Sequence, residues 1–381
     1  MTWEGLLDRP DVSLRRSGRF LVAELHGPHR VLSTSVRNGG QTDHVRFLLN
    51  HQSCEGAGHL ARHDMMTAGL DAYHDIACAE AGVPAIETAL MGTAANMNYL
   101  AVSTQEDQSI AVTAAVTAGV EGNATTAGDA ASWRETSAGM TKVSYAGTIN
   151  TMLLLHQPVT PAALARAIVT MTEGKSSGLL RLAVPSRQGP DLATGTGTDQ
   201  YCVASPVDLA GGGLPLTSAS PHVKLGELIG VATRNATMEA VRWQNGLEPS
   251  YTRGVLHALS RYGVREATFI DDITPFLDEA SLELLRKNLR AALYEPLVGA
   301  AAHALAAVCD RARHGMLPES AARDARLQQA ALIAANLAAR VERWPEFRAT
   351  LRVHADADAK TLALAALALG WSEKWRSSSS A

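Results

Sequence analysis

The sequence contains few cysteines and few aromatic residues. Aromatic residues make up 5% of the chain although hydrophobic residues make up 46%, so we expect a core of small and branched side chains. Widely spaced cysteines argue against a disulfide framework or a zinc knuckle and favour free thiols in a reducing compartment. The 381 residues include four cysteines, none in a Cys-x-x-Cys pair: Cys54, Cys78, Cys202 and Cys309.

Long apolar runs and an excess of basic charge are also missing. No run of about 18 apolar residues occurs, which argues against a membrane-spanning helix. Residues 1–8 lack the basic stretch and apolar centre of a secretory signal. The 34 Lys and Arg residues are balanced by 38 Asp and Glu residues, a net charge of −4. Because nucleic-acid binding normally needs a basic excess, we expect a cytoplasmic protein that contacts neither nucleic acid nor membrane.

The sequence changes in character near residue 245. Before this point Gly, Thr, Ser and Asn interrupt short apolar runs, as in sheets joined by functional loops. After it, Ala, Leu, Arg and Glu recur at helical spacing. We therefore predict an α/β domain over 12–242, with a mixed central sheet flanked by helices, followed by an α-helical domain over 243–376. Residues 377–381 have the composition of a solvated tail.

Four segments of the first domain have the pattern of strands. Arg19–Leu25 and Arg30–Thr34 flank Gly27-Pro28, which suggests a hairpin. Residues 109–119 alternate between larger and smaller side chains with a period of two, and Thr148–His156 is apolar enough for a buried strand. The order of the strands in the sheet cannot be read from these patterns.

A helix is well signalled after the last of these strands. Thr160 is a natural N-cap, and Pro161 suits the first helical position. The apolar stripe that starts at Leu164 and Met171 also carries Lys175. A lysine that faces a sheet is costly unless it is paired or extends to solvent. Two alternatives stay open: an aliphatic stem that reaches water, or an ammonium group that is paired or faces a substrate.

The second domain is predicted to be a helical bundle or a cap over the first domain. Leucines recur every three or four residues from Asp278 to Cys309, and Ala321–Val341 is similar. Thr361–Leu369 forms a final helix in this interpretation. Alanine-rich helices of this kind pack closely.

Polar clusters fall at the predicted strand ends, where a sheet protein tends to keep its site. Their glycines let the backbone approach a ligand, and their Thr, Asn, Asp and Glu residues supply nucleophiles, orienting amides, acids and bases. A P-loop, a dinucleotide fingerprint and a Gly-x-Ser-x-Gly elbow are all absent. One such cluster alone would be plain turn chemistry, but together they favour a site: 35–40, 117–124, 147–150 and 193–199.

Histidines crowd the early part of the chain. His59 and His63 are four residues apart, which would place both on one helical face and suits a metal. The intervening residues lack the glutamate of a zincin, so a solvated helix surface is the favoured interpretation. His51, close to Cys54, is similarly ambiguous. No histidine has strong metal-ligand spacing.

Several short segments carry a resemblance when they are taken in order. They are 30–40, 50–52, 91–95, 116–124, 127–129, 147–150, 172–175, 184–187, 193–199 and 224–230. Over about residues 20–240 this ordered set resembles the adenosylcobinamide amidohydrolase (CbiZ-type) family. One departure from the family pattern is Gly174, where a better helix former is expected.

The resemblance implies hydrolysis of the amide that joins aminopropanol to the corrin ring of adenosylcobinamide. The product would be adenosylcobyric acid, which re-enters cobamide synthesis in a cytoplasmic salvage reaction. The resemblance implies no nucleotide and no cofactor, since cobalt enters only as part of the corrinoid substrate.

The family does not assign the catalytic roles, so we assign them by chemistry. Glu121 and Asp199 are the carboxylates that could activate water or a hydroxyl group and protonate the leaving amine. Thr148, Thr196 and Thr198 are candidate nucleophiles or hydrogen-bond donors. With Asn150, which would orient the amide or hold the oxyanion, Glu121, Asp199, Thr148 and Thr198 form the expected catalytic set.

The other candidates are expected to bind the substrate. Asn123 resembles Asn150 in its chemistry, and Lys175 would lower the pKa of a neighbour or bind a carboxylate product. His51 or His222 would act as a base or touch the lower face of the cobalt. The expected substrate-binding residues are Asn38, His51, Asn123, Lys175, Thr196, His222 and Lys224.

Three alternatives remain open on the sequence alone. The His-rich segment 51–75 and the region after 245 depart from the family, so the substrate could be another large ligand with an amide, such as a siderophore. The chain could also be a corrinoid-binding protein without catalysis. The helical region would serve either as a lid or as a surface for homo-oligomer formation.

Overall fold

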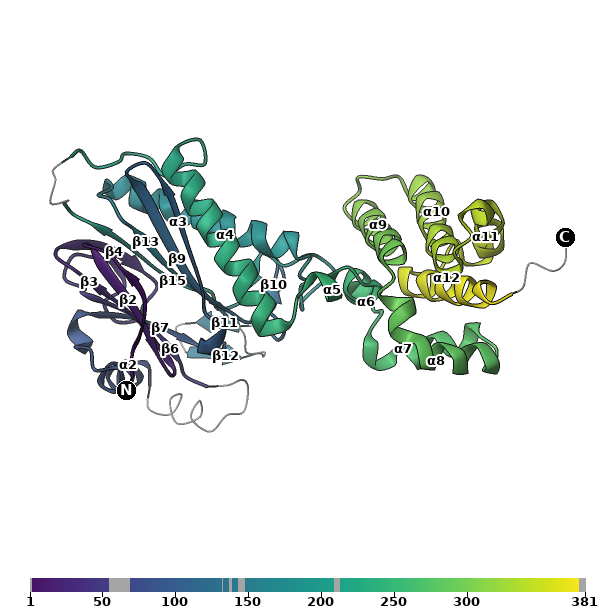
Figure 1. Cartoon of the computed structure of the whole chain (residues 1–381), viewed down its shortest axis with the longest axis horizontal. Coiled ribbons are helices and arrows are strands. Elements are labelled where there is room, and N and C mark those ends of the chain that lie inside the picture. The colour runs from purple at the N-terminus through teal and green to yellow at the C-terminus, as the bar shows by residue number, and fades with distance from the viewer. Residues whose placement is uncertain are drawn as a thin grey trace. The chain divides into compact units, whose positions relative to one another are not determined.

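The structure is a computed structural model that describes residues 2–54, 69–131, 133–136, 139–142, 148–208 and 213–376. The pair His59 and His63, Gly147 and the tail 377–381 lie outside the described residues. The chain divides into two compact units, Met1–Gly246 and Leu247–Ala381 (Figure 1). An α/β part followed by an α-helical part was predicted, and this fold class is confirmed.

Two sheets make up most of the first unit. One has the order β1-β2-β3-β6-β7, formed by Glu4–Asp8, Val12–Ser17, Phe20–Leu25, Phe47–Gln52 and Thr88–Thr93. The other has the order β5-β4-β15-β13-β9-β8, formed by Gly40–Thr42, His29–Ser33, Gln200–Pro206, Ile149–Leu155, Ile110–Ala118 and Ala101–Asp107. Two short pairs accompany them: β10 with β14, Ala124–Thr125 and Gly195–Thr196, and β11 with β12, Trp133–Thr136 and Gly139–Lys142.

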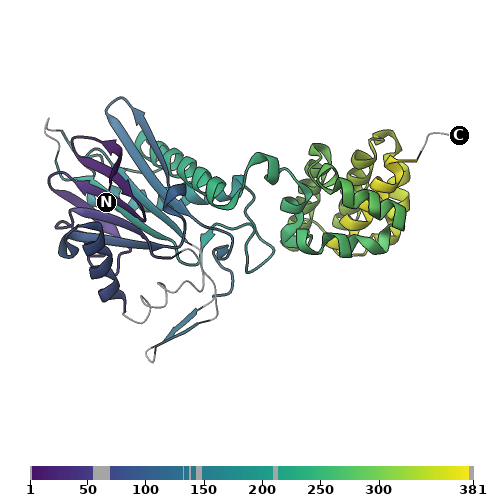
Figure 2. The ribbon, with the colours of Figure 1, turned by 60° about the horizontal axis from the view of Figure 1, so that its bottom comes forward.

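The two sheets pack face to face, with helices on their outer faces (Figures 1 and 2). Leu21 and Leu48 of the first sheet share an apolar core with Ala115 and Met152 of the second. Because side chains alternate along a strand, Val22 and its neighbours face outward and pack on helix α2, Leu70–Ala81. Helices α3, Pro161–Arg181, and α4, Lys224–Asn245, cover the second sheet. The single central sheet of the prediction is thus divided into two stacked sheets.

The crossover from β13 to β15 determines which residues meet at one end of the second sheet. These two strands run parallel, so the connecting helix α3 must return to the end where both begin. Its N-terminus is as predicted: the Thr160 hydroxyl accepts a hydrogen bond from the Ala163 N–H at 3.3 Å, and Pro161 follows. The last turns of α3, which include Lys175, therefore lie near the start of β15.

The hairpin expected around Gly27-Pro28 is wrong. β3 pairs with β2 and β6 in the first sheet, whereas β4 pairs with β15 and β5 in the second. The connection between them therefore crosses from one sheet to the other. A short turn between two apolar strands predicts that these strands pair with each other. Here β3 and β4 instead belong to two different sheets, whose apolar faces are buried against each other.

The second unit is entirely helical in its described part. Its helices α5 to α12 are Pro249–Thr252, Val255–Leu259, Phe269–Ile273, Glu279–Leu293, Pro296–Arg313, Glu319–Ala338, Trp344–Thr350 and Ala359–Lys374. Short 3-10 helices are Ala85–Glu87 and Met97–Tyr99 in the first unit, and Ser260–Tyr262, Glu266–Thr268, Thr274–Phe276, Val341–Arg343 and Leu351–His354 in the second.

The leucine pattern that runs from Asp278 to Cys309 does not form one helix. It divides into α8 and α9, because Pro296 begins a new helix and cannot continue the one before it. Among the described residues no single helix is long and apolar enough to cross a membrane, and one pair, α8 with α9, bent by 76°, passes that test of length and composition only when its members are combined.

Candidate active site

Two buried asparagines join the sheets where the predicted polar clusters meet. Asn50 on β6 donates a hydrogen bond from Nδ2 to the Thr117 hydroxyl on β9 at 2.9 Å. Asn150 on β13 donates from Nδ2 to Asn50 Oδ1 at 2.9 Å and to the carbonyl of Gly92 on β7 at 3.0 Å. Asn50, Thr117 and Asn150 are almost completely buried. Buried amides require such partners, so this network fixes one sheet against the other.

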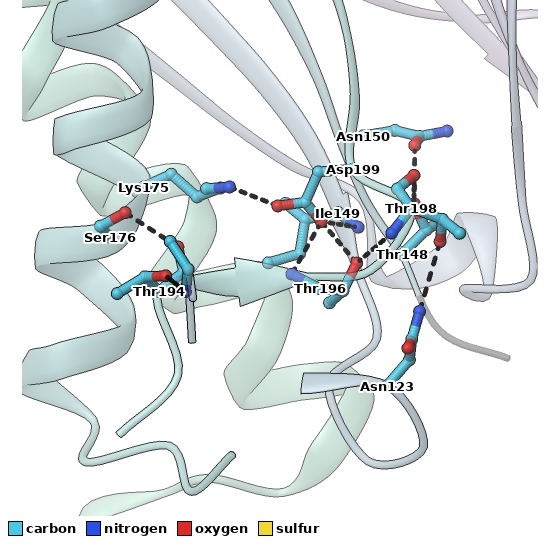
Figure 3. Close-up of polar contacts among 11 residues, drawn as sticks. Asn123, Thr148, Ile149, Asn150, Lys175, Ser176, Thr194, Thr196, Thr198 and Asp199 are labelled. Carbon is cyan, nitrogen blue, oxygen red and sulfur yellow. Dashed lines mark hydrogen bonds and ion pairs between the residues drawn. The ribbon is translucent and has the colours of Figure 1, made fainter. Parts of the chain in front are cut away.

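The orientation of the Asn150 amide follows from its partners. The Gly92 carbonyl can only accept, so the amide nitrogen of Asn150 must face it. Oδ1 is then directed to the Thr148 hydroxyl, 3.3 Å away. That hydroxyl also donates to the carbonyl of Thr198 at 2.6 Å (Figure 3). Thr148 and Asn150 are thus joined to the loop that precedes β15.

Asp199 is the centre of a second group of contacts. Its Oδ1 accepts from the N–H groups of Ile149 and Thr196, both at 3.1 Å, and from the Thr196 hydroxyl at 2.5 Å. Its Oδ2 forms an ion pair with the ammonium group of Lys175, which reaches it from α3 (Figure 3). The side chains of Lys175 and Asp199 are 13% and 20% exposed. Of the two alternatives for Lys175, the structure therefore shows the paired one.

Gly195 makes room for this ion pair. A Cβ atom at this position would lie 2.5 Å from Asp199 Oδ2 and 2.7 Å from Lys175 Nζ. Both distances are shorter than van der Waals contact, so the pair rests directly on the glycine backbone. The Gly-Thr-Gly-Thr-Asp segment thus needs its first glycine for the close approach of side chains.

Asn123 and Glu121 lie at the same end of the second sheet, in the turn after β9. The Asn123 carbonyl accepts from the Gly197 N–H at 3.2 Å, and its side-chain amide donates to the Thr198 hydroxyl at 3.5 Å. Glu121 is exposed, and within the described part of the chain no hydrogen bond or ion pair of its carboxylate is present. The structure therefore offers an unpaired carboxylate in the same turn as Asn123.

Asp129 holds together the two loops that carry Asn123 and Thr196. It accepts from the Thr126 N–H at 2.8 Å and from the Ser186 hydroxyl at 2.6 Å. Burial opposes ionisation of this carboxyl, but the hydrogen bond from Ser186 and the others that it accepts lower its pKa below the usual value. Two of the matching segments, 127–129 and 184–187, thus meet at one carboxylate.

Asn38 lies apart from this group and covers the edge of β7. Its side-chain amide donates to the carbonyls of Ala85 and Thr88 at 3.1 and 2.9 Å. The hydroxyl of Ser35 accepts from the Leu90 N–H at 2.8 Å. At the other end of the strand, Gln200 Oε1 accepts from the Gly92 N–H at 2.9 Å, close to Asn150. The segment around Asn38 therefore satisfies the backbone of an edge strand.

His222 and Lys224 also lie apart from Asn150. They stand at the start of α4, where Lys224 pairs with Glu227 at 2.7 Å. This hydrogen bond, together with the charges of Glu227 and of Asp107, raises the pKa of Lys224. Asp107 ends β8 opposite the first residue of β9, whereas the asparagine network lies at the last residues of β9. The two groups are therefore at opposite ends of the second sheet.

His51 lies on the face of the first sheet opposite to that of Asn50. Its ring stacks on Phe20, with ring centroids 4.8 Å apart, and its Nδ1 is 2.9 Å from the Tyr73 hydroxyl. Burial, assisted by the positive charge of Arg19, lowers the pKa of His51 to about 4. His51 is thus a neutral ring packed under α2 and is not brought to Asn150.

The expected site residues did not include Asn50, Thr117 and Gly92, although all three lie in matching segments and Thr117 begins the polar cluster 117–124. The sequence signal that could have indicated this group is Asn50, because its amide follows the apolar residues 47–49 within one strand. The four cysteines are unpaired and buried. Within the described residues, no group of three or more His, Cys, Asp or Glu side chains could hold a metal ion.

Comparison with known proteins assigns the chain to a family. A family model described as adenosylcobinamide amidohydrolase matches residues 4–249, more than half of the chain. An uncharacterized protein of Methanocaldococcus jannaschii is 35% identical over 181 residues, which cover 44% of this chain and 68% of the relative. The region that the family model matches, 4–249, includes every residue of the buried network and of the Asp199 contacts. The chain therefore belongs to the adenosylcobinamide amidohydrolase family.

Proposed function

We propose that this chain hydrolyses the amide between aminopropanol and the corrin ring of adenosylcobinamide and releases adenosylcobyric acid. Family membership supports amide hydrolysis of a corrinoid. The observation that carries the proposal is the convergence of Asn123, Asn150, Thr196 and Asp199, from three separate chain segments, at one end of the second sheet. In this proposal cobalt belongs to the substrate, no further cofactor takes part, and the reaction takes place in the cytoplasm.

The group contains the kinds of side chain that amide hydrolysis needs. The tetrahedral intermediate carries an oxyanion that requires hydrogen-bond donors, and the side-chain amide of Asn123, which lies 3.5 Å from the Thr198 hydroxyl, would supply one. The leaving amine requires a proton, and the exposed Glu121 carboxyl is free to carry one. Asn150, locked by Gly92, keeps Thr148 and the loop before β15 in place.

The proposal is tested with the full chain and a panel of substrates. Purified protein is incubated with adenosylcobinamide, its phosphate, cobalamin and an iron–siderophore amide, and the products are identified by mass. We expect aminopropanol and adenosylcobyric acid from adenosylcobinamide. Release of a product from the siderophore alone would reassign the substrate. Binding of adenosylcobinamide without any product would mean that the chain only holds corrinoids.

A further inference from the structure

The three threonines near Asp199 differ in what their hydroxyl groups contact. The Thr148 hydroxyl donates to a backbone carbonyl, which cannot take up its proton. The Thr198 hydroxyl accepts from the amide of Asn123. The Thr196 hydroxyl donates to a carboxylate, Asp199 Oδ1, at 2.5 Å. A hydroxyl nucleophile needs an adjacent acceptor that can remove its proton, and for Thr196 such an acceptor is in place.

A third group orients that acceptor. Lys175 holds the second oxygen of Asp199, while backbone N–H groups hold the first, so the carboxylate cannot rotate away from Thr196. Thr196, Asp199 and Lys175 therefore form a chain of contacts from nucleophile to proton acceptor to orienting group, the arrangement that covalent catalysis uses. Thr196 retains 8% exposure, whereas Thr117 of the asparagine network is fully buried.

The two glycines beside Thr196 bring polar side chains close to it. The ends of Lys175 and Asp199 cover Gly195. The Thr198 N–H lies 3.5 Å from Thr196 Oγ1, and the side chain of Asn123 lies against Gly197. The side-chain amide of Asn123, next to Gly197, would supply a hydrogen bond to the oxyanion that forms after attack by Thr196.

We propose that Thr196 is the nucleophile of the hydrolysis, an inference that rests on the proposed function. Thr196 Oγ attacks the carbonyl carbon of the amide between corrin and aminopropanol, and its proton passes to Asp199. The C–N bond breaks, the amine leaves with a proton from the Glu121 carboxyl, and the corrin carboxyl is left as an ester of Thr196. Water then attacks the ester and gives one proton to Glu121, and Thr196 leaves and recovers its proton from Asp199.

The second unit contains a matched control for this arrangement. The Thr268 hydroxyl donates to Asp272 Oδ2 at 2.7 Å, and Lys360 pairs with the same carboxylate at 2.8 Å. The three side-chain types are thus the same as at Thr196, Asp199 and Lys175, but no glycines flank Thr268 and the site lies outside the family match. A hydroxyl-to-carboxylate bond can therefore be removed here without touching the proposed nucleophile.

The test compares Thr196→Ala, Thr196→Ser and Thr268→Ala in the full chain, with unfolding curves to confirm that each is folded. We expect Thr196→Ala to lower kcat for adenosylcobinamide at least 1,000-fold, about the size of removing an activated nucleophile. Thr196→Ser keeps a hydroxyl and should stay within about tenfold of the wild type, and Thr268→Ala should be unchanged. In acid-quenched wild type, the peptide that contains Thr196 should carry the corrinoid acyl group by mass.

The outcomes separate this inference from the proposed function. If the wild type releases aminopropanol and Thr196→Ala does so within tenfold of its rate, Thr196 is not the nucleophile although the function stands. Equal loss in Thr196→Ser and Thr196→Ala, both folded, also overturns it, since the hydroxyl would then not be the reacting group. If the wild type releases no aminopropanol, the proposed function fails and this assignment fails with it.

Discussion

Gly174 of α3 faces the backbone of Gly230 of α4 so closely that a Cβ on Gly174 would lie 2.8 Å from the Gly230 carbonyl oxygen. A Cβ on Gly230, in contrast, would meet nothing within 4 Å. The glycine that is unfavourable for helix propensity at 174 is therefore required by the contact of two helices, which explains the departure from a better helix former.

We predict that Gly174→Ala destabilises the first unit and Gly230→Ala does not. The added methyl at 174 meets backbone atoms that cannot rotate away, so overpacking should cost about 1–3 kcal/mol. The same change at 230 meets open space and should stabilise the helix by about 0.5–1 kcal/mol. Urea unfolding of both variants measures the difference. Equal unfolding midpoints would show that the helices separate without cost.

Gly195→Ala should separate Lys175 from Asp199 with a small effect on stability. The methyl would overlap the ends of these two side chains, which can move, rather than backbone. Hydrolysis of adenosylcobinamide should then fall by about tenfold or more, since a 1 Å displacement in a site costs up to about 100-fold. Gly230→Ala is the control for an added methyl elsewhere. Unchanged kcat in Gly195→Ala would mean that the ion pair has no part in the reaction.

Glu121→Gln should lower kcat and leave the fold unchanged. Glu121 is exposed and has no partner among the described residues, so its removal breaks no contact. General acid or base catalysis contributes about 100- to 10,000-fold, and a loss in this range is expected if Glu121 protonates the leaving amine. Glu283→Gln, an exposed position in the second unit, is the control. Activity of Glu121→Gln equal to that of Glu283→Gln would exclude this role.

The pair of Asp11 and His156 should make stability depend on acidic pH. Burial opposes ionisation of Asp11, but the hydrogen bond and the charge of His156, with a smaller effect of His29, bring its pKa below the usual 3.8. The folded protein therefore binds the proton less readily than the unfolded chain, and this stabilisation is present above about pH 4 and lost as pH falls through the folded pKa.

Asp11→Asn measures this contribution. The free energy of unfolding of wild type should exceed that of Asp11→Asn by about 1.5–3 kcal/mol at pH 7, the range of hydrogen bonds to charged groups. The difference should shrink as the pH is lowered from 5 toward 3. A constant difference over this range would show that the charge of Asp11 does not contribute.

His51 should make the free energy of unfolding depend on pH as well. As with Asp11, stability should fall as the pH falls, but over a higher range of pH. Burial lowers its folded pKa to about 4 from 6.5, so between these values the unfolded chain takes up a proton that the folded chain does not. Wild type should therefore lose stability as pH falls from 6.5 to 4, by at most about 1.4 kcal/mol per pH unit. His51→Phe keeps the stack on Phe20 and should lack this slope, and parallel curves would contradict the assignment.

Local signals in the sequence predicted the elements better than their partners. The period of two in β9 and the N-cap at Thr160 depend on neighbouring residues, and both elements are present as expected. The pairing of β3 and β4 with strands of different sheets depends on distant residues, and the turn between them carries no trace of it. Similarly, Pro296 divides the long leucine pattern into α8 and α9, a division that the leucine spacing alone does not show.

The candidate site could be predicted in part for the same reason. Thr148, Asn150 and Asp199 lie at the starts of β13 and β15, which are neighbours in one sheet, and Thr196 is three residues before Asp199, so polar strand ends were enough to group them. Asn50 belongs to the other sheet, and its contact with Asn150 depends on how the sheets stack. The alternation of Asn50 and His51 along β6 also shows that two adjacent polar residues need not share a site.

The coverage of β7 has a consequence for self-association. The N–H groups of Leu90 and Gly92 are held by the side chains of Ser35 and Gln200, and the carbonyls of Thr88 and Gly92 by those of Asn38 and Asn150. A second polypeptide that approached the edge of β7 would find these backbone groups of β7 already hydrogen-bonded. Extension of the first sheet by strand addition at β7 is thus blocked by amide and hydroxyl groups rather than by charge or proline.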